Sequence, residues 1–243
     1  MTIDTPQACH IPQLRQLWQE AFGDSDAFTE LFFAHGFSPE RCLAATEADT
    51  VLGALYWFDC EPELAYIYGV GVFKAFRGRG VGQALMEAVH GHLRKKGCIL
   101  CPADEALFGY YQKLGYTPCA PVRTVTCCAG TPITLKTVDA GRYAQVRRTR
   151  LPAGAAVLGA EGIGFLASYA KLLEGNGFVA SAVLDGDTVY GELLGDVSAA
   201  PGITAALGCK KGSFRTPGDQ PFAMFLPLQE DIAPPTYLGL ALD

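Results

Sequence analysis

The stretch VGVFKAFRGRGVGQALMEA, residues 70–88, decides the fold of this chain. A strand pattern ends near Val72, a turn follows, and a helix begins within the run Arg77-Gly78-Arg79-Gly80-Val81-Gly82. Glycine permits a tight turn and close approach of the backbone to a ligand, and the first amides of a helix lie unpaired at its positive end. The pattern predicts a loop that binds a pyrophosphate through backbone amides, with Arg77 and Arg79 adding charge nearby. A Gly-x-Gly alone would favour a turn that merely starts a helix.

Two common phosphate loops do not fit this stretch. A dinucleotide-binding fingerprint needs a third glycine, and Gln83 stands at that position. The Walker pattern, GxxxxGK followed by Ser or Thr, occurs nowhere in the chain, and neither does GxSxG or HExxH. His90 and His92 are two positions apart on the predicted helix, so they face different ways and make a poor metal pair. The missing glycine argues against a nucleotide-dependent oxidoreductase.

Hydrophobic periodicity around the loop predicts alternating helices and strands. Residues 11–22 form one apolar helical stripe that Gly23 ends, and Asp24 to Asp26 begin the next helix. The other elements predicted in the first half are strands at 41–46, 51–58, 64–72 and 97–101 and helices at 80–96 and 104–114, ended by Gly97 and Gly115. Lys95 and Lys96 suit the C-terminal end of the helix before Gly97, where the helix dipole favours cations.

The balance of acidic and basic residues changes after about Pro121. The pattern of the second half predicts strands at 122–127, 133–138, 178–184, 188–194, 222–228 and 236–242 and helices at 140–150 and 165–173. The sequence Asp185-Gly186-Asp187 lies between two of these strands and is typical of a hairpin turn. We therefore expect two domains, residues 1–122 and residues 123–243.

Composition and charge limit the function classes. The chain has 243 residues, 49% hydrophobic and 18% charged, which predicts one large or two small globular domains. The net charge of −6 argues against a nucleic-acid-binding protein, and no apolar run approaches the ~20 residues of a membrane helix. Nine cysteines without an export signal predict reduced thiols in a cytoplasmic protein. Cys98 and Cys101 form a CxxC inside an apolar strand pattern, which favours buried thiols over a metal site.

The phosphate-loop residues resemble the GNAT superfamily of acyl-CoA-dependent N-acetyltransferases. The pyrophosphate loop of that family reads Arg or Gln, two residues, Gly, one residue, then Gly or Ala, and Arg77, Gly80 and Gly82 fill these positions. Its second signature is a tyrosine four residues before a Gly-aromatic pair, and the run Tyr111-Gln112-Lys113-Leu114-Gly115-Tyr116 matches it. Two signatures in the right order and spacing are much stronger than either one.

The resemblance covers roughly residues 1–122 and implies a fold. It implies an α/β (α+β) class, with a GNAT-like mixed twisted sheet flanked by helices. The leading helices are also similar to those of the enhanced intracellular survival acetyltransferases, which carry a second, degenerate GNAT-like α+β domain. Residues 123–243 are expected to form such a domain, and they lack a glycine-rich loop of the required form, so we expect them to bind no coenzyme.

The activity implied by the resemblance is transfer of an acetyl group from acetyl-CoA to a primary amine, without a metal. Val70, Gly71 and Val72 correspond to the splayed strand that contacts the pantetheine, and the Val72 amide is a candidate oxyanion donor. The residues expected to bind the coenzyme are Val70, Gly71, Val72, Arg77, Gly78, Arg79, Gly80, Val81 and Gly82. Tyr111 corresponds to the acid that protonates the departing thiolate, whereas its neighbour Tyr110 is interpreted as structural.

The general base and the acceptor stay open at this point. No acid lies between Leu64 and Val72, and Asp59, Glu61 and Glu63 precede this strand in positions typical of solvated loop acids. The resemblance to the survival-type enzymes also brings in the terminal carboxylate, here that of Asp243. Peptide, polyamine, aminoglycoside and small-metabolite amines all fit as acceptors, and a homo-oligomer is left open. The alternative from another class is a non-catalytic acyl-CoA-binding or sensing module of the same fold.

Overall fold

A computed structural model describes residues 1–242 and divides the chain into two compact units. The first unit comprises Met1–Thr117 together with Phe225–Ala233, and the second comprises Pro118–Met224 together with the chain from Pro234 onward. Whereas the sequence predicts a single crossing near residue 122, the chain returns to the first unit for one segment before it re-enters the second. Asp243 lies outside the described residues, so the role predicted for its carboxylate stays a prediction.

A mixed sheet in the order β1-β2-β3-β4-β5-β14-β6 forms the framework of the first unit. Its strands are Thr2–Asp4 (β1), Cys42–Glu47 (β2), Thr50–Glu61 (β3), Leu64–Val72 (β4), Gly97–Leu100 (β5), Ala223–Pro227 (β14) and Thr117–Cys119 (β6). The strands from β1 to β4 pair antiparallel, and β4 pairs parallel with β5. The α/β class with a mixed twisted sheet is confirmed.

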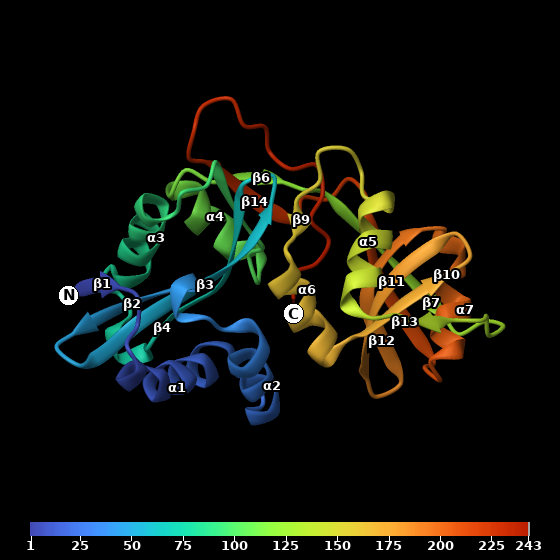
Figure 1. Ribbon diagram of the computed structural model, residues 1–243, viewed down its shortest axis with the longest axis horizontal. Helices are drawn as coiled ribbons and strands as arrows, with labels where there is room; N and C mark the ends of the chain where they lie inside the picture. The colour runs from blue at the N-terminus through green and yellow to red at the C-terminus, as the bar shows by residue number, and fades with distance from the viewer. Residues whose placement is uncertain (243) are drawn as a thin grey trace. The chain divides into compact units, whose positions relative to one another are not determined.

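Two pairs of helices cover the two faces of this sheet (Figure 1). They are Ile11–Phe22 (α1), Asp26–Leu31 (α2), Val81–His92 (α3) and Glu105–Lys113 (α4). The first helix buries Leu14, Leu17 and Trp18 and ends at Gly23, whose φ of 72° only glycine adopts freely. On β4, a Cβ added at Gly71 would lie 3.1 Å from the Ala21 Cβ, so α1 packs closely against the end of that strand.

The helix predicted at 80–96 is shorter than the sequence indicates. It ends at His92 because Leu93 is already extended, with φ −71° and ψ 129°. Lys95 and Lys96 form ion pairs with Asp59 and Glu63 instead of capping the helix. Gly97 opens β5, where a Cβ would lie 2.5 Å from the Phe225 ring. Tight packing against β14 therefore accounts for a glycine that the sequence pattern assigned to a helix end.

The second unit is built on a sheet in the order β7-β13-β12-β11-β10-β8. Its strands are Val122–Cys128 (β7), Lys211–Pro217 (β13), Thr188–Gly195 (β12), Phe178–Asp185 (β11), Lys171–Gly175 (β10) and Lys136–Thr137 (β8). The pairing is antiparallel except between β12 and β13. The predicted hairpin is confirmed, since Asp185 pairs with Thr188 across Gly186, whose φ is 54°.

Helices lie on both sides of the second sheet, and a short strand, Val157–Leu158 (β9), precedes one of them. The helices are Ala140–Arg150 (α5), Ala160–Tyr169 (α6) and Ala200–Ala206 (α7). One face of the sheet packs a hydrophobic core that includes Phe178, Val189, Ile203 and Phe214, and α7 contributes Ile203 to it. The opposite face carries polar residues, among them Glu192 and Arg215, which stand opposite each other in the β12–β13 ladder.

Two predictions in the second unit are wrong. The helix predicted at 165–173 begins earlier, at Ala160, and ends at Tyr169, and Lys171–Gly175 is strand β10. Leu172 and Leu173 fit either pattern, and pairing with β11 decides for the strand. Residues 236–242 join no ladder among the described residues, because Gly239 adopts a φ of 73° that breaks an extended run, although Tyr237, Leu238 and Leu240 are buried.

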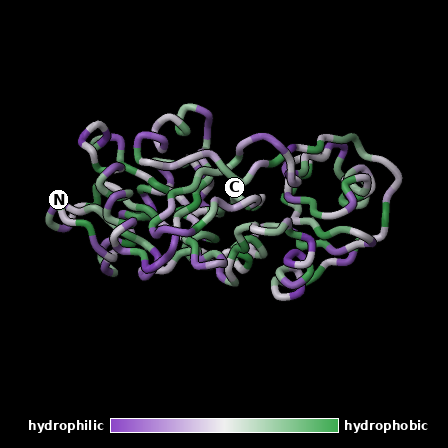
Figure 2. Tube along the Cα trace, turned by 90° about the horizontal axis from the view of Figure 1, so that it is seen from above, coloured by the Kyte–Doolittle hydropathy of each residue, from purple (hydrophilic) through white to green (hydrophobic). Residues whose placement is uncertain are grey.

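Hydropathy follows this architecture within each unit, with many hydrophilic segments on the outer loops and helices (Figure 2). Within residues 1–242 no helix is long and apolar enough to cross a membrane.

Candidate functional site

The end of β4 separates from its neighbour and leaves a free strand edge. The parallel ladder between β4 and β5 stops at Ile67, opposite Leu100, whereas the ladder between β4 and β3 continues to Val72. The amide of Phe73 donates to the Leu52 carbonyl of β3, over 3.0 Å. Because backbone groups alternate along an antiparallel strand, the amides and carbonyls of Val70 and Val72 point away from β3. The gap between the two strands therefore presents backbone groups that pair with neither strand, and of these the Val72 carbonyl accepts from the Arg77 Nε.

A bulge at Gly69 sets the direction of this edge. Tyr56 of β3 faces Tyr68 and Leu55 faces Val70, so Gly69 is an extra residue in β4. Its φ is 70°, and an added Cβ would lie 3.1 Å from the Trp18 ring. Both the conformation and the packing require glycine here. The bulge shifts the residues after it by one position, which aims Val70 and Val72 at the gap.

The glycine-rich loop leads from this strand into α3, as the sequence predicts. Gly78 and Gly80 adopt φ values of 75° and 77°, and Gly80 caps the helix. The first helical hydrogen bond is donated by the Ala84 amide to the Gly80 carbonyl, over 3.0 Å. The amides of Val81, Gly82 and Gln83 precede that bond and lie at the positive end of the helix dipole. An added Cβ at Gly78 or Gly80 would meet no atom within 4 Å, so the loop surface is open.

Both arginines of the loop are held by neighbouring groups. The Arg77 Nε donates to the Val72 carbonyl over 3.1 Å, which ties the loop to the end of β4. Arg79 pairs with Glu47 at 3.1 Å and lies over the Phe76 ring at 5.5 Å. Their positive charge is therefore close to the helix start, while the backbone amides are the donors that face open space.

Tyr111 lies on α4 in a mostly buried position. Asp104 caps this helix by accepting from the Leu107 amide, and Tyr111 is 9% exposed. Burial, with a smaller effect of Tyr110, raises the pKa of Tyr111 to about 12. Its phenol is therefore protonated at neutral pH, and by a wider margin than the ordinary value near 10 would give.

Two aromatic neighbours surround Tyr111: Tyr116, the aromatic of the Gly-aromatic pair, and Tyr110. The Tyr116 ring lies 5.8 Å from the Tyr111 ring, and the Tyr116 hydroxyl is 2.8 Å from the His90 Nε2. Burial lowers the pKa of His90, so its ring is neutral at pH 7. Tyr110 is the second neighbour, and its hydroxyl lies 3.4 Å from the position of a Cβ on Gly82, over the first turn of α3. The adjacent tyrosines thus have different surroundings, Tyr111 beside the Tyr116 ring and Tyr110 over the first turn of α3.

Residues 11–116 match the sequence profile of the acetyltransferase (GNAT) family. The first unit carries a GNAT acetyltransferase domain. The matched segment includes the bulged strand, the glycine loop and Tyr111, and it ends at Tyr116. No curated protein matches the chain.

Solved structures extend the likeness to the second unit. A GCN5-related N-acetyltransferase from Anabaena variabilis is 14% identical with a TM-score of 0.71, covering 94% of this chain and 73% of that one. One from Kribbella flavida is 16% identical with a TM-score of 0.68, covering 93% and 72%. Eis1 from Mycobacterium abscessus is 10% identical with a TM-score of 0.62, covering 94% and 74%. At these identities the likeness establishes the fold alone.

Asp59 and Glu63, two of the acids considered as a general base, lie at the other end of β4 from Val72. Asp59 is opposite Ala65 in the β3–β4 ladder and pairs with Lys95 at 2.8 Å, and Glu63 pairs with Lys96. At ~3.3 Å per strand residue, Ala65 and Val72 are roughly 20 Å apart. These two carboxylates therefore belong to surface ion pairs at the other end of the strand.

The cysteines of the chain are free thiols. Burial raises the pKa of Cys98 to about 12, so this thiol is protonated and unreactive at neutral pH. Within residues 1–242 no group of three or more His, Cys, Asp or Glu side chains is placed to hold a metal.

Proposed function

We propose that the protein transfers the acetyl group of acetyl-CoA to a primary amine. The family of its first domain supplies acyl transfer from acetyl-CoA. The observation that carries the finer proposal is the gap beside Val70 and Val72, which runs directly into the amide-rich start of α3. An extended acetyl donor that carries a pyrophosphate at one end and a thioester at the other matches these two features, with the pyrophosphate at the start of α3 and the thioester at the gap.

The coenzyme is proposed to bind along the backbone. Its pyrophosphate accepts hydrogen bonds from the amides of residues 78–82, where the helix dipole favours an anion. Its pantetheine amides pair with the free edge of β4 at Val70, as an added strand would, and the Val72 amide is left for the thioester oxygen. The tie between Arg77 and the Val72 carbonyl keeps strand and loop in one arrangement. Binding at two rigid points fixes the thioester carbon, which is the main requirement for attack by a second molecule.

The chemical step is proposed as direct attack. The neutral amine adds to the thioester carbon, and the carbonyl oxygen becomes an oxyanion that the Val72 amide stabilises. The carbon–sulfur bond then breaks, the Tyr111 phenol gives its proton to the departing sulfur, and the nitrogen loses a proton to water. Solvent returns a proton to Tyr111. The products are an N-acetyl amine and free coenzyme A.

Turnover with amines separates this proposal from a binding module without catalysis. Release of the coenzyme thiol from acetyl-CoA is measured against a panel of polyamine, aminoglycoside, peptide and small-metabolite amines. We expect at least one amine to accelerate release well above hydrolysis, with the acetylated amine as product by mass spectrometry. Coenzyme binding with no amine-dependent release across the panel would favour the sensing module.

The second unit is proposed to be a degenerate GNAT-like domain that binds no coenzyme, because its strands have no glycine-rich loop of the required form. One coenzyme per chain is expected by native mass spectrometry. We also propose a cytoplasmic location, because the nine cysteines are free thiols.

A further inference from the structure

The described contacts of Tyr111 involve its ring and its backbone. The Tyr116 amide donates to the Tyr111 carbonyl over 3.1 Å, in the turn that ends α4. The two rings meet edge to face, with 5.8 Å between centroids and 65° between planes. The Tyr110 ring lies 5.1 Å away on the other aromatic contact, but that side chain is 36% exposed, whereas Tyr116 is 1% exposed. Tyr116 is therefore the fixed neighbour that restricts the direction of the Tyr111 phenol.

Three elements meet at the Tyr116 hydroxyl. It lies 2.8 Å from the His90 Nε2 of α3, and it is hydrogen-bonded to the Cys98 thiol of β5. A hydroxyl donates one hydrogen bond and accepts another, so it can donate to the neutral His90 ring and accept from the thiol. Because a buried hydroxyl without a partner is costly, the Tyr116 side chain cannot turn away from His90 without a penalty.

The helix α3 connects this hydroxyl to the glycine loop. Gly80 caps the start of α3, and His90 lies in the last turn of the same 12-residue helix. At 1.5 Å per residue, the two positions are roughly 15 Å apart along one rigid element. The hydrogen bond between His90 and Tyr116 therefore joins the helix that starts at the open loop amides to the segment that holds Tyr111.

We propose that His90 and Tyr116 are positioning residues for Tyr111, and that their hydrogen bond fixes the Tyr111 phenol with respect to a coenzyme bound at the start of α3. The inference rests on the proposed acetyl transfer, in which Tyr111 protonates the departing sulfur. Proton transfer needs donor and acceptor within hydrogen-bond reach, so a small displacement of the phenol slows the reaction. Loss of the bond lowers kcat and leaves coenzyme affinity unchanged, because the loop amides remain in place.

The first test measures turnover with hydroxylamine, a small neutral nucleophile that needs no extended acceptor site. It attacks acetyl-CoA to give acetohydroxamate and free coenzyme A, and thiol release is followed after subtraction of the uncatalysed rate. We expect kcat to fall about five- to tenfold in His90→Leu and in Tyr116→Phe, while the calorimetric Kd for coenzyme A stays within about twofold of the wild type. His90→Gln should retain about half of the wild-type kcat or more, because its amide oxygen can accept from the Tyr116 hydroxyl.

The double variant His90→Leu with Tyr116→Phe separates positioning from stability. It removes both partners, so the unfolding free energy in urea should recover from the loss in His90→Leu. The kcat should stay as low as in the single variants, because the hydrogen bond is still missing. The matched control is His92→Leu, on the same helix but in contact with the Trp57 ring, which should turn over as the wild type does. Recovery of kcat together with stability, multiplication of the two single losses, or equal losses in His90→Leu and His90→Gln would overturn the proposal.

The second test is independent of turnover. In protein labelled with 3-fluorotyrosine, the ¹⁹F resonance of Tyr111 is assigned by its loss in Tyr111→Phe. With coenzyme A added, we expect this resonance to shift or split in His90→Leu and to keep its wild-type position in His90→Gln and His92→Leu. An unchanged Tyr111 resonance in a folded His90→Leu variant would overturn the proposal. The expected shifts in a wild-type background that does not turn over would count against acetyl transfer and still support the positioning of Tyr111 by His90.

Discussion

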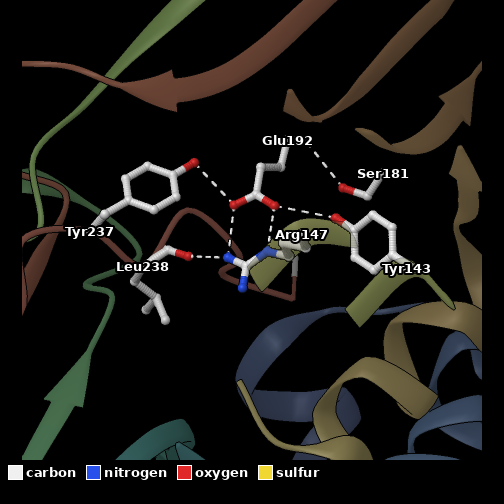
Figure 3. Close-up of polar contacts among 6 residues, drawn as sticks. All are labelled: Tyr143, Arg147, Ser181, Glu192, Tyr237 and Leu238. Carbon is white, nitrogen blue, oxygen red and sulfur yellow. Dashed lines mark hydrogen bonds and ion pairs between the residues drawn. The ribbon is translucent and has the colours of Figure 1, made fainter. Parts of the chain in front are cut away.

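The two units use polar groups in opposite ways. The first unit presents backbone amides at the edge of β4 and at the start of α3, and its charged side chains lie beside these amides. The second unit buries charged side chains, and Arg147 and Glu192, at 1% exposure each, form an ion pair through two hydrogen bonds (Figure 3). A backbone site requires glycines with unusual φ values, whereas a side-chain network requires residues that meet only in the folded chain. The comparison predicts that substitutions will damage the first unit mainly in function and the second mainly in stability.

The largest effect is expected at Tyr111. Tyr111→Phe removes the acid and keeps the ring that packs beside Tyr116, so turnover with a true acceptor should fall 10²–10⁴-fold. Coenzyme affinity should stay unchanged. Steady-state rates and calorimetric titration with coenzyme A test this split.

Tyr110→Phe is the matched control, because it removes the adjacent hydroxyl from the same helix. We expect a smaller loss of turnover than in Tyr111→Phe. Wild-type rates in Tyr111→Phe would reduce this residue to a packing role.

The buried ion pair gives the next effect. Arg147→Met leaves the Glu192 carboxylate buried without its partner, which should cost about 3–5 kcal/mol of unfolding free energy. Urea denaturation measures the loss. Arg147→Met with Glu192→Leu removes both charges and should recover most of it.

Arg142 provides the control for this comparison. It lies on the same helix and pairs with Glu174 at the surface, where its side chain is 44% exposed. Arg142→Met should cost much less unfolding free energy than Arg147→Met, because solvent screens the exposed pair. An equal loss of unfolding free energy in Arg142→Met and Arg147→Met would mean that burial does not determine how much each ion pair contributes to stability.

The sequence predicts the first unit well because its site is local in the chain. Strand, loop and helix follow one another within residues 70–88, and Gly80 and Tyr111 stand at fixed spacings that a linear pattern can reveal. The bulge at Gly69 escapes such a pattern, because it depends on register with β3 and on the Trp18 ring. His90 beside Tyr116 escapes it for the same reason, since 26 residues separate them.

The second unit is less predictable because its features depend on distant pairings. Arg147 and Glu192 are 45 positions apart, and neither stands in a motif. The run around Leu172 and Leu173 suits a helix as well as a strand until β11 is beside it. The assignment of 225–233 to the first unit likewise depends on strand pairing, in which β14 enters the sheet next to β5.

A smaller effect is expected in the glycine loop. Gly80→Asp places a side chain and a negative charge where the amides face open space, and it strains a residue with φ of 77°. Coenzyme affinity should weaken tenfold or more by calorimetry. Gly208→Asp is a control in the second unit, at a similar φ of 77° with open space around it. It should leave coenzyme affinity unchanged, whereas equal weakening in both variants would remove the loop from the coenzyme site.

The smallest expected effect is an absence of change with pH. Burial raises the pKa of Tyr111 to about 12. Its protonated form is therefore fully present below about pH 10, and it is lost only as the pH rises through this pKa of about 12. Turnover should therefore not decline between pH 7 and 10 through this group, and it should rise where the acceptor amine loses its proton. The measurement is kcat against pH in wild type and Tyr111→Phe, over a range in which circular dichroism shows both folded. A decline centred near pH 9 in the wild type and missing from the variant would mean that the phenol ionises earlier than its burial predicts, and that the coenzyme or acceptor changes its surroundings.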